Sequence, residues 1–238
     1  MESTLDMLAL TPPGWGGNLL RGLWHSLQIA FGAFGFGLII GFFGAYGKIY
    51  GGPILRDLLG LYTAIVRSVP ELVLILILYY IGSDLINQAA SAMGYDRVEL
   101  SGVAAGIWVL SIVQGAYATE VLRGAITNIP AGQIEAARAF GMRPALMARR
   151  IIIPAMAALA IPGLANLWLI ATKDTALLAV VGFAELTLET KQAAASTRAY
   201  FTFYGAAGLL YLLVTLLSNI GFGRLEKWAR RGQVKPKA

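Results

Sequence analysis

Residues 128–154 read NIPAGQIEAARAFGMRPALMARRIIIP, a polar stretch inside an otherwise apolar chain. Pro130 suits the first turn of a helix, residues 131–140 are good helix formers, and Gly141 stands where a left-handed C-terminal cap belongs. The stretch therefore predicts a short helix over 131–140, followed by arginines and by an apolar run that opens at Ile151. A helix of about ten residues is marginal alone, so contact with other protein must hold it.

The sequence on both sides of this stretch is that of a membrane protein. Apolar residues make up 57% of the 238 residues and charged residues only 13%, against about a quarter in soluble domains. The apolar residues come in blocks of about twenty, the length that a helix needs to cross a bilayer. We therefore expect an all-α, polytopic fold with one transmembrane domain over residues 1–238. The five expected spans are roughly Leu19–Tyr46, Leu58–Ile81, Ser101–Ile126, Ile151–Ala171 and Phe201–Phe222.

Small residues mark one face of the first span. Ala33, Gly37, Gly41 and Ala45 recur every four residues. Small side chains let a second helix approach closely inside a membrane. This face is expected to be a helix contact, although glycine is also simply common in membrane helices.

Charged residues interrupt the second and third spans. In the second, Arg67-Ser68-Val69-Pro70-Glu71 breaks the apolar run, and its proline predicts a kink. Arg67 and Glu71 are four residues apart, so they either neutralise each other or take part in transport. Near the end of the third span, Glu120 and Arg123 are expected to form an ion pair.

The fourth span is interrupted as well. Pro162 inside it predicts a kink. Lys173, Asp174 and Thr175 follow its end, and a second apolar piece covers 176–183. A helix broken near membrane depth is tolerated only where it lines a cavity or is buried in protein.

The basic residues predict the orientation of the chain, because cytoplasmic loops are rich in Lys and Arg. With five spans, the N-terminus is placed on the outer side of the membrane, and the loop at about 127–150 and the C-terminal tail are placed in the cytoplasm. The expected cytoplasmic side then holds Lys48, Arg56, Arg67, Arg123, Arg138, Arg143, Arg149, Arg150, Arg224, Lys227, Arg230, Arg231, Lys235 and Lys237. The other side holds Arg21, Arg97, Lys173, Lys191 and Arg198.

Several classes of function are disfavoured. The excess of basic residues, 19 against 13 acidic ones, is explained by cytoplasmic loops, so no nucleic-acid partner is expected. The chain has no cysteine and a single histidine, His25, which we expect to be hydrogen-bonded or interfacial. No catalytic residues, metal site or cofactor are expected. The phosphate-loop pattern G-x-x-x-x-G-K-[ST] is absent from the sequence, so an outside partner must bind and hydrolyse any ATP.

The polar stretch also carries a family motif. Glu135-Ala136-Ala137, three residues, Gly141, nine residues and Ile151-x-Ile153-Pro154 resemble the EAA signature of ABC importer permeases, with Ile153 in place of a leucine. The rest of the chain resembles the polar amino acid branch, near the histidine/lysine/arginine/ornithine and opine permeases. That resemblance is carried by residues 67–73, 115–124, 129–133 and 173–177.

The resemblance implies an assembly in the bacterial inner membrane. The family pairs two permease subunits around one pathway, with two ATP-binding subunits below and a periplasmic substrate-binding protein above; here a paralogue is the expected second permease. The helix at 131–140 would be the coupling helix. The residues that would couple to the ATPase are Glu135, Ala136, Ala137, Gly141 and Pro154.

The resemblance also implies where the cargo passes. The candidates for the substrate pathway are Lys173, Asp174, Thr175 and Glu71. The chain departs from some relatives at Leu167, where they have an acid, so the partner permease is an alternative source of substrate contacts. A secondary transporter driven by an ion gradient is the competing function, although five spans contain no evident inverted repeat.

Overall fold

The computed structural model describes residues 4–96 and 101–231, and every regular element in those residues is a helix. Five helical stretches are long and apolar enough to cross a bilayer: Gly16–Tyr50, Glu71–Ala92, Gly102–Thr127, Pro144–Val181 and Tyr200–Ala229. The expected all-α fold with five spans is confirmed. The elements are α1 (Thr4–Met7), α2 (Gly16–Tyr50), α3 (Pro53–Ser68), α4 (Glu71–Ala92), α5 (Gly102–Thr127), α6 (Ala131–Ala139), α7 (Pro144–Met147), the π-helix η1 (Ala148–Ile152), α8 (Ile153–Asp174), the 3-10 helix η2 (Thr175–Val181), α9 (Leu186–Thr197) and α10 (Tyr200–Ala229).

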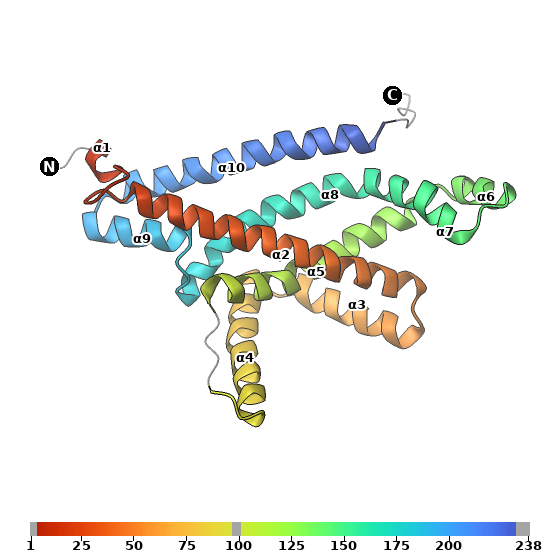
Figure 1. Ribbon diagram of the computed structural model, residues 1–238, viewed down its shortest axis with the longest axis horizontal. Helices are drawn as coiled ribbons and strands as arrows, with labels where there is room; N and C mark the ends of the chain where they lie inside the picture. The colour runs from red at the N-terminus through yellow and green to blue at the C-terminus, as the bar shows by residue number, and fades with distance from the viewer. Residues whose placement is uncertain (1–3, 97–100, 232–238) are drawn as a thin grey trace.

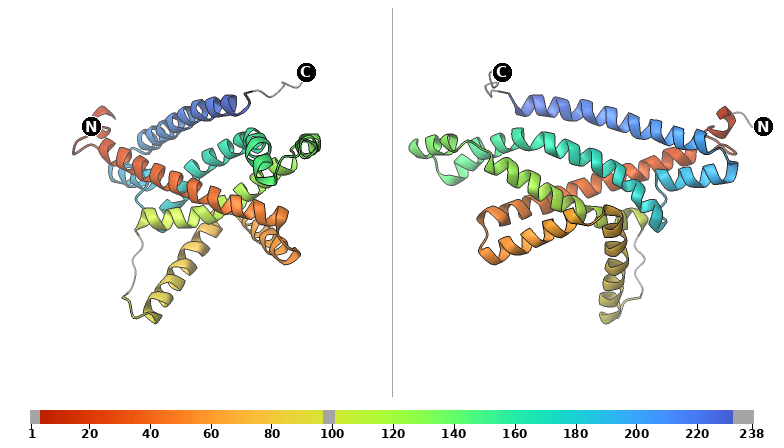
Figure 2. Two further views of the ribbon diagram at one scale, coloured as in Figure 1. Left: turned by 45° about the vertical axis from the view of Figure 1, so that its right-hand side comes forward. Right: turned by 180° about the vertical axis from the view of Figure 1, so that it is seen from behind.

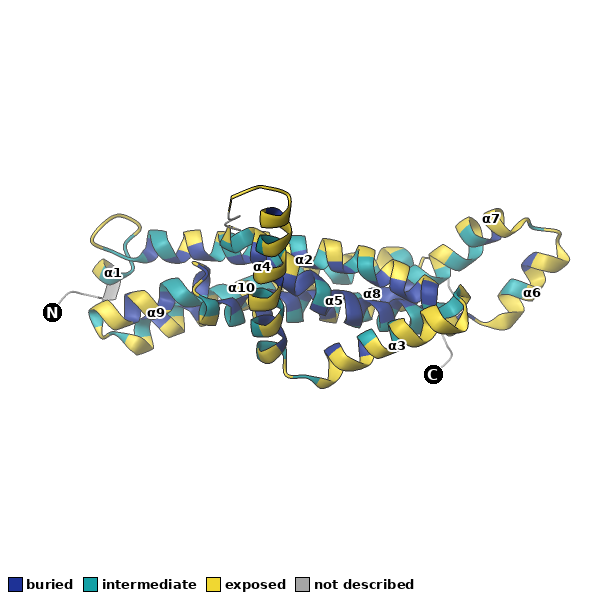
Figure 3. Ribbon diagram, turned by 90° about the horizontal axis from the view of Figure 1, so that it is seen from below, coloured by how far each residue is buried: buried dark blue, intermediate teal, exposed yellow. Residues whose placement is uncertain are grey.

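Three long helices, α2, α8 and α10, run along the length of the molecule (Figure 1). The short helices α6 and α7 lie at one end, and α1 and α9 lie at the other; α4 projects away from the rest in both further views (Figure 2). Helix α5 is covered by its neighbours, whereas α6 is largely exposed (Figure 3). The candidates for coupling to the ATPase, around α6, and the candidates for the substrate pathway, around the end of α8, therefore belong to different parts of the fold.

The closest packing joins α2 to α5 through small residues. Gly37 and Gly41 of α2 are both buried. A Cβ atom at Gly41 would lie 2.5 Å from the Cβ of Ala118 and 2.9 Å from its backbone carbonyl carbon. Ala33 and Ala45 are buried on the same helix. The small-residue face predicted from the sequence is thus a helix contact.

Valine at Gly41 should destabilise the protein. Its side chain would meet the α5 backbone, which cannot swing aside, so we expect a loss of about 1–3 kcal/mol in the free energy of unfolding, the usual range for overpacking. Gly35→Val is the matched control, because a Cβ at Gly35 meets nothing within 4 Å. Thermal unfolding of the purified protein in detergent checks this, and equal melting temperatures for the two variants would rule it out.

The second span differs from its predicted bounds of 58–81. The chain breaks completely between α3 and α4, where Val69 and Pro70 are extended, with ψ of 138° and 133°. Pro70 has no N–H to continue the helix and disfavours helical backbone at the residue before it. The membrane-crossing helix is therefore α4, and α3 packs against α2 and α5 instead.

The same break corrects the expected pairing of Arg67 with Glu71. The two residues lie on different helices, so the four-residue spacing of a continuous helix does not apply. The ion pairs within residues 4–96 and 101–231 join Glu120 to Lys48 and to Arg123, and Glu226 to Arg230. The predicted Glu120–Arg123 pair is confirmed.

Other boundaries also moved. The residues after 183, predicted as a polar connection, contain α9, and the last span runs on to Ala229. The predicted break after the fourth span is confirmed, since α8 ends at Asp174 and gives way to η2. Three of the basic residues used for orientation, Arg97, Lys235 and Lys237, lie outside the described residues.

Candidate functional site

The predicted coupling helix is α6, and its C-terminal end has a defined geometry. Phe140 caps the helix, and Gly141 follows it with a left-handed φ of 69°. The N–H of Gly141 donates to the carbonyl of Arg138 at 2.9 Å, and the N–H of Met142 donates to the carbonyl of Ala137 at 3.0 Å. This pair of bonds is the Schellman motif, which requires a left-handed residue where Gly141 stands.

Helix α6 presents its predicted residues unequally. Glu135 and Ala136 are exposed, whereas Ala137 is buried against the chain itself. Phe140 is 86% exposed, although it is a large aromatic side chain. Gly141 is also exposed, and a Cβ there would meet nothing within 4 Å. The helix thus has one face that packs inward and one that is open to a partner.

A π-helical turn connects this region to α8. In η1 the N–H of Ile153 donates to the carbonyl of Ala148, five residues back. Pro154 follows directly, and a proline lacks the N–H that an α-helix would direct at residue 150. The wider π turn accommodates this missing bond, and π turns of this kind are frequent at functional sites. Arg149 and Arg150 lie exposed on the same turn.

The second set of predicted residues surrounds the end of α8. Asp174 is 7% exposed, and its Oδ2 accepts a hydrogen bond from Gln114 Nε2 at 3.4 Å. Thr175 is fully buried, and its hydroxyl donates to the carbonyl of Thr172 at 2.9 Å. Lys173 is exposed. Only Asp174 of the three therefore offers a buried charge.

Glu71 joins this group from another helix. It is the first residue of α4 and half-buried, and its carboxylate accepts from the Tyr117 hydroxyl at 3.4 Å. Asp174 interacts directly with Glu71. The structure thus brings two of the predicted residues together with two that the sequence prediction did not include, Gln114 and Tyr117. We name these four residues the Asp174 cluster.

The signals for the two added residues were present but weak. Gln114 is an amide in the middle of an apolar span, and Tyr117 stands three residues later on the same face of α5. Nothing in the sequence says that this face meets Asp174, because that contact depends on how α5 packs on α8. Leu167 is buried in α8 and contributes no charge to the cluster.

An ion cluster joins three helices nearer the α6 end. Glu120 of α5 binds Lys48 of α2 at 2.5 Å and Arg123 at 2.8 Å. Lys48 also donates to the hydroxyl of Thr63 on α3 at 2.6 Å. Buried ions need such partners, because an unpaired charge here is costly. The cluster holds α3 beside α2 after the chain has turned at Gly51.

A buried carboxylate ties the opposite end together. Glu185 is fully buried at the start of α9 and accepts from the N–H of Leu188 at 2.8 Å as the helix cap. Ser26 of α2 and Tyr211 of α10 each donate a hydroxyl to it at 3.3 Å. His25 Nδ1 donates to the carbonyl of Ala184 at 2.8 Å, which confirms the expectation that this histidine is hydrogen-bonded.

Glu185 makes stability depend on pH. Burial raises the pKa of its carboxyl above the ordinary value of 4.5, although hydrogen bonds from the neighbouring backbone N–H groups and hydroxyls act to lower it. For an acid with a raised folded-state pKa, the contribution to stability is present below pH 4.5 and is lost as the pH rises through the folded pKa. Wild-type protein should therefore lose stability on going from pH 4.5 toward neutral.

Glu185→Gln should flatten this dependence, since the amide stays neutral and can still accept from Leu188. Melting temperature against pH in detergent measures it. Glu189→Gln on the same helix is the matched control and should keep the wild-type slope. A Glu185→Gln profile parallel to wild type would contradict this assignment.

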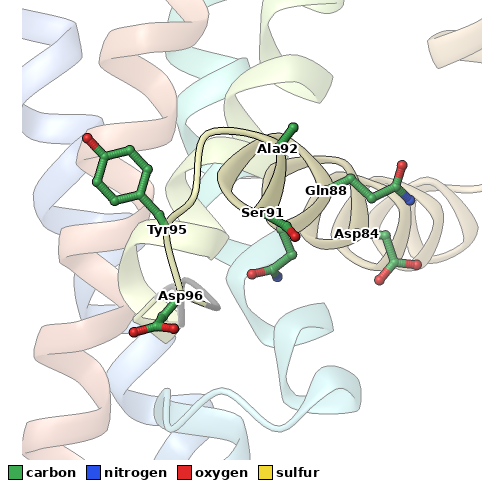
Figure 4. A pocket seen from close by; sticks show the side chains of 7 residues that line it. Asp84, Gln88, Ser91, Ala92, Tyr95 and Asp96 are labelled. Atoms are coloured by element: carbon green, nitrogen blue, oxygen red, sulfur yellow. The ribbon is translucent and has the colours of Figure 1, made fainter.

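A polar hollow of about 880 Å³ lies at the end of α4 remote from Glu71 (Figure 4). Asp84, Gln88 and Ser91 come from α4, and Tyr95 and Asp96 from the turn beyond it. None of the predicted site residues lines it. Within residues 4–96 and 101–231, no three His, Asp or Glu side chains are grouped so as to hold a metal ion.

Comparisons with known proteins agree over most of the chain. Residues 35–231 match the family described as binding-protein-dependent transport system inner membrane component. The nopaline transport system permease protein of Agrobacterium fabrum is 41% identical over 230 residues, which cover 96% of this chain and 98% of that protein. The histidine/lysine/arginine/ornithine transport system permease protein of Escherichia coli is 36% identical over 206 residues, covering 87% of this chain and 90% of that one.

A solved structure has the same fold. The crystal structure of an amino acid ABC transporter with histidines matches with a TM-score of 0.77 at 28% sequence identity, over 96% of this chain and 99% of that one. That match takes in nearly the whole length of both chains.

Proposed function

The chain belongs to the family of inner membrane components of binding-protein-dependent transport systems, and from this premise we propose that it forms half of the pathway of an ATP-driven importer for polar, mainly basic, amino acids or opines. It is a permease subunit and is not itself an enzyme. The observation that carries the proposal is the capped, exposed helix α6, which one turn joins to the continuous helical stretch of α7, η1 and α8 that ends at the buried Asp174. ATP is bound and hydrolysed by two partner subunits.

Coupling is assigned to α6 and the turn that follows it. Glu135 and Ala136 meet the ATP-binding subunit, the first as a fixed charge and the second as a slim surface that lets α6 enter a groove. Ala137 keeps the opposite face of α6 on its own chain. Gly141 turns the backbone toward α7, and Pro154 sets the π turn that begins α8.

Helix α8 carries the displacement inward. Its 22 residues span about 33 Å at 1.5 Å per residue, so a shift of α6 at one end reaches Asp174 at the other. Closure of the ATP-binding subunits would move α6 and switch the pathway between its two openings. No covalent step in this chain is required.

The cargo is assigned from the charges at the pathway. Asp174 and Glu71 lie next to each other, and no basic side chain within residues 4–96 and 101–231 forms an ion pair with either. A cationic cargo supplies the missing charge. Lys173 lies exposed beside them and suits the carboxylate end of an amino acid, while Thr175 fixes the break below. The relatives named for nopaline and for histidine, lysine, arginine and ornithine support this class.

The orientation places the N-terminus in the periplasm and the 127–150 loop and C-terminal tail in the cytoplasm of a bacterial inner membrane. It is supported by the gathering of the arginine-rich loop, the α2–α3 turn and the end of α10 at one end of the molecule (Figure 1). Partners are a second permease subunit, of paralogous sequence, and a periplasmic substrate-binding protein. The secondary-transporter alternative is set aside with the family assignment.

Uptake of labelled amino acids into proteoliposomes holding the complete complex tests the cargo class. With binding protein and ATP present, lysine, arginine or histidine should accumulate and glutamate should not. Equal uptake of glutamate and the basic amino acids would overturn the assignment of an acidic pathway. A variant binding protein that accepts several amino acids keeps the test directed at the permease.

A further inference from the structure

Gln114 holds the one buried side-chain oxygen or nitrogen that has no hydrogen-bond partner in the described residues, its Oε1. The side chain is 1% exposed, so this oxygen is shielded from bulk solvent in the conformation that the structure describes, and the pathway must open for a ligand to reach it. A buried acceptor left unpaired costs about 1–3 kcal/mol. An amide kept at such a cost beside two acids points to a ligand that supplies the donor.

The surroundings hold this amide in one direction. The backbone of α2 at Gly37 lies directly against the stem of Gln114, since a Cβ atom added there would stand 2.8 Å from the Cβ of Gln114. The Nε2 of Gln114 donates to Asp174. The free Oε1 is on the same head group, and it therefore lies at the Asp174 cluster rather than elsewhere in the core.

Acceptors outnumber donors in the Asp174 cluster. Gln114 donates to Asp174 and Tyr117 donates to Glu71, and both bonds are long at 3.4 Å. The only other hydrogen-bonding partner of the Asp174 carboxyl within the cluster is the carboxyl of Glu71. Lys173 acts on Asp174 only through its field, since no ion pair joins them in the described chain. Two carboxylates and one neutral oxygen are thus short of N–H donors, a need that an ammonium or guanidinium group meets.

We propose that Gln114 is a specificity residue of the pathway: it positions Asp174 through Nε2, and its Oε1 accepts a hydrogen bond from the cationic group of the cargo. This rests on the proposed function and adds a distinction to it. The acids attract any positive charge, whereas Gln114 recognises an N–H donor. A primary ammonium satisfies both, and a trimethylated ammonium satisfies only the first.

Ligand-induced thermal stabilisation of the complete complex in detergent, without binding protein or ATP, measures this directly. The probes are lysine and Nε-trimethyllysine. Wild type should bind lysine the more tightly of the two. Gln114→Leu should weaken lysine binding about tenfold, the equivalent of one hydrogen bond to a charged group, and leave the binding of trimethyllysine unchanged.

Three further variants keep the result interpretable. Gln114→Glu retains an acceptor and should keep the preference for lysine. Gln114→Met preserves the length of the side chain and should behave like Gln114→Leu. If one of the two variants fails to fold, the other still gives the measurement. Gln88→Leu, an exposed glutamine of α4, is the matched control and should behave as wild type.

The outcomes separate this inference from the function on which it rests. An unchanged ratio of lysine to trimethyllysine affinity in both Gln114→Leu and Gln114→Met would overturn the role of Gln114 and leave the cargo class standing. Wild-type complex that neither binds nor imports lysine or arginine would overturn the cargo class, and this inference with it.

Discussion

Replacing Gly141 by proline is expected to lower ATP-driven uptake by at least about tenfold, since a strained backbone position costs about 1–3 kcal/mol and 1.4 kcal/mol is a factor of ten. Gly141 has a φ of 69°, and the proline ring fixes φ near −65°. The variant also removes the N–H that donates to Arg138. Helix α6 then loses its C-terminal cap and its orientation relative to α7. The membrane spans do not include this turn and should stay folded.

The physical reason predicts which substitution is tolerated. Asparagine visits the left-handed region more readily than other residues with a side chain, and a Cβ atom at 141 would meet no neighbour within 4 Å. Gly141→Asn should therefore retain most uptake. Uptake and co-purification of the ATP-binding subunit are measured together. If Gly141→Pro assembled and transported like wild type, α6 would not be the coupling element.

Asparagine at Asp174 is expected to reduce uptake of lysine and arginine at least about tenfold, because a hydrogen bond to a charged group contributes about 1.5–3 kcal/mol. The substitution keeps the shape of the side chain and the oxygen that accepts from Gln114, so the fold should not change. What it removes is the buried negative charge that the cargo meets beside Glu71. ATP hydrolysis in the absence of cargo should remain.

Asp84→Asn provides the matched control for this effect. Asp84 is an exposed acid on α4 that lines the remote polar hollow, and its amide should leave uptake unchanged. Equal loss in the two variants would indicate a general dependence on acidic residues. Uptake that survives Asp174→Asn would place the cargo site elsewhere, for example on the second permease subunit.

Local features of this fold were readable from the sequence because their causes are local. Apolar runs of membrane length gave the number of spans and the approximate position of four of them, and Gly141 predicted the left-handed turn. The four-residue spacing of Gly37 and Gly41 predicted a close helix contact, because small residues at this spacing lie on one face of a helix and let a neighbouring helix approach. The break after Asp174 followed from three polar residues between two apolar runs.

The second span was misplaced for a reason that is also physical. Apolar residues occur on both sides of Pro70. The apolar run in the sequence therefore continues across the position where the helix is interrupted. Helix α3 has its own apolar stripe, with Ile54, Leu58, Leu61 and Ile65 exposed, and this stripe resembles a span in composition. Tertiary contacts place α3 beside α2: Thr63 accepts a hydrogen bond from Lys48, and Leu55 and Leu59 pack at Gly47.

Tertiary contacts account for the rest. Glu185 reads as one acid in a polar connection, and the sequence contains nothing that brings Ser26 and Tyr211 to it. The Asp174 cluster likewise depends on the angle at which α5 meets α8. The sequence therefore predicted the chemistry of the side chains at these positions but not the residues that they contact.

We infer that work done by ATP enters this chain through α6. Uptake of labelled lysine into proteoliposomes with the second permease, the ATP-binding subunits and the binding protein tests it most directly, with ATP supplied inside and ion gradients collapsed by ionophores. We expect uptake to require ATP, to survive the ionophores and to be lost with Gly141→Pro. Uptake driven by a proton or sodium gradient without ATP would contradict it.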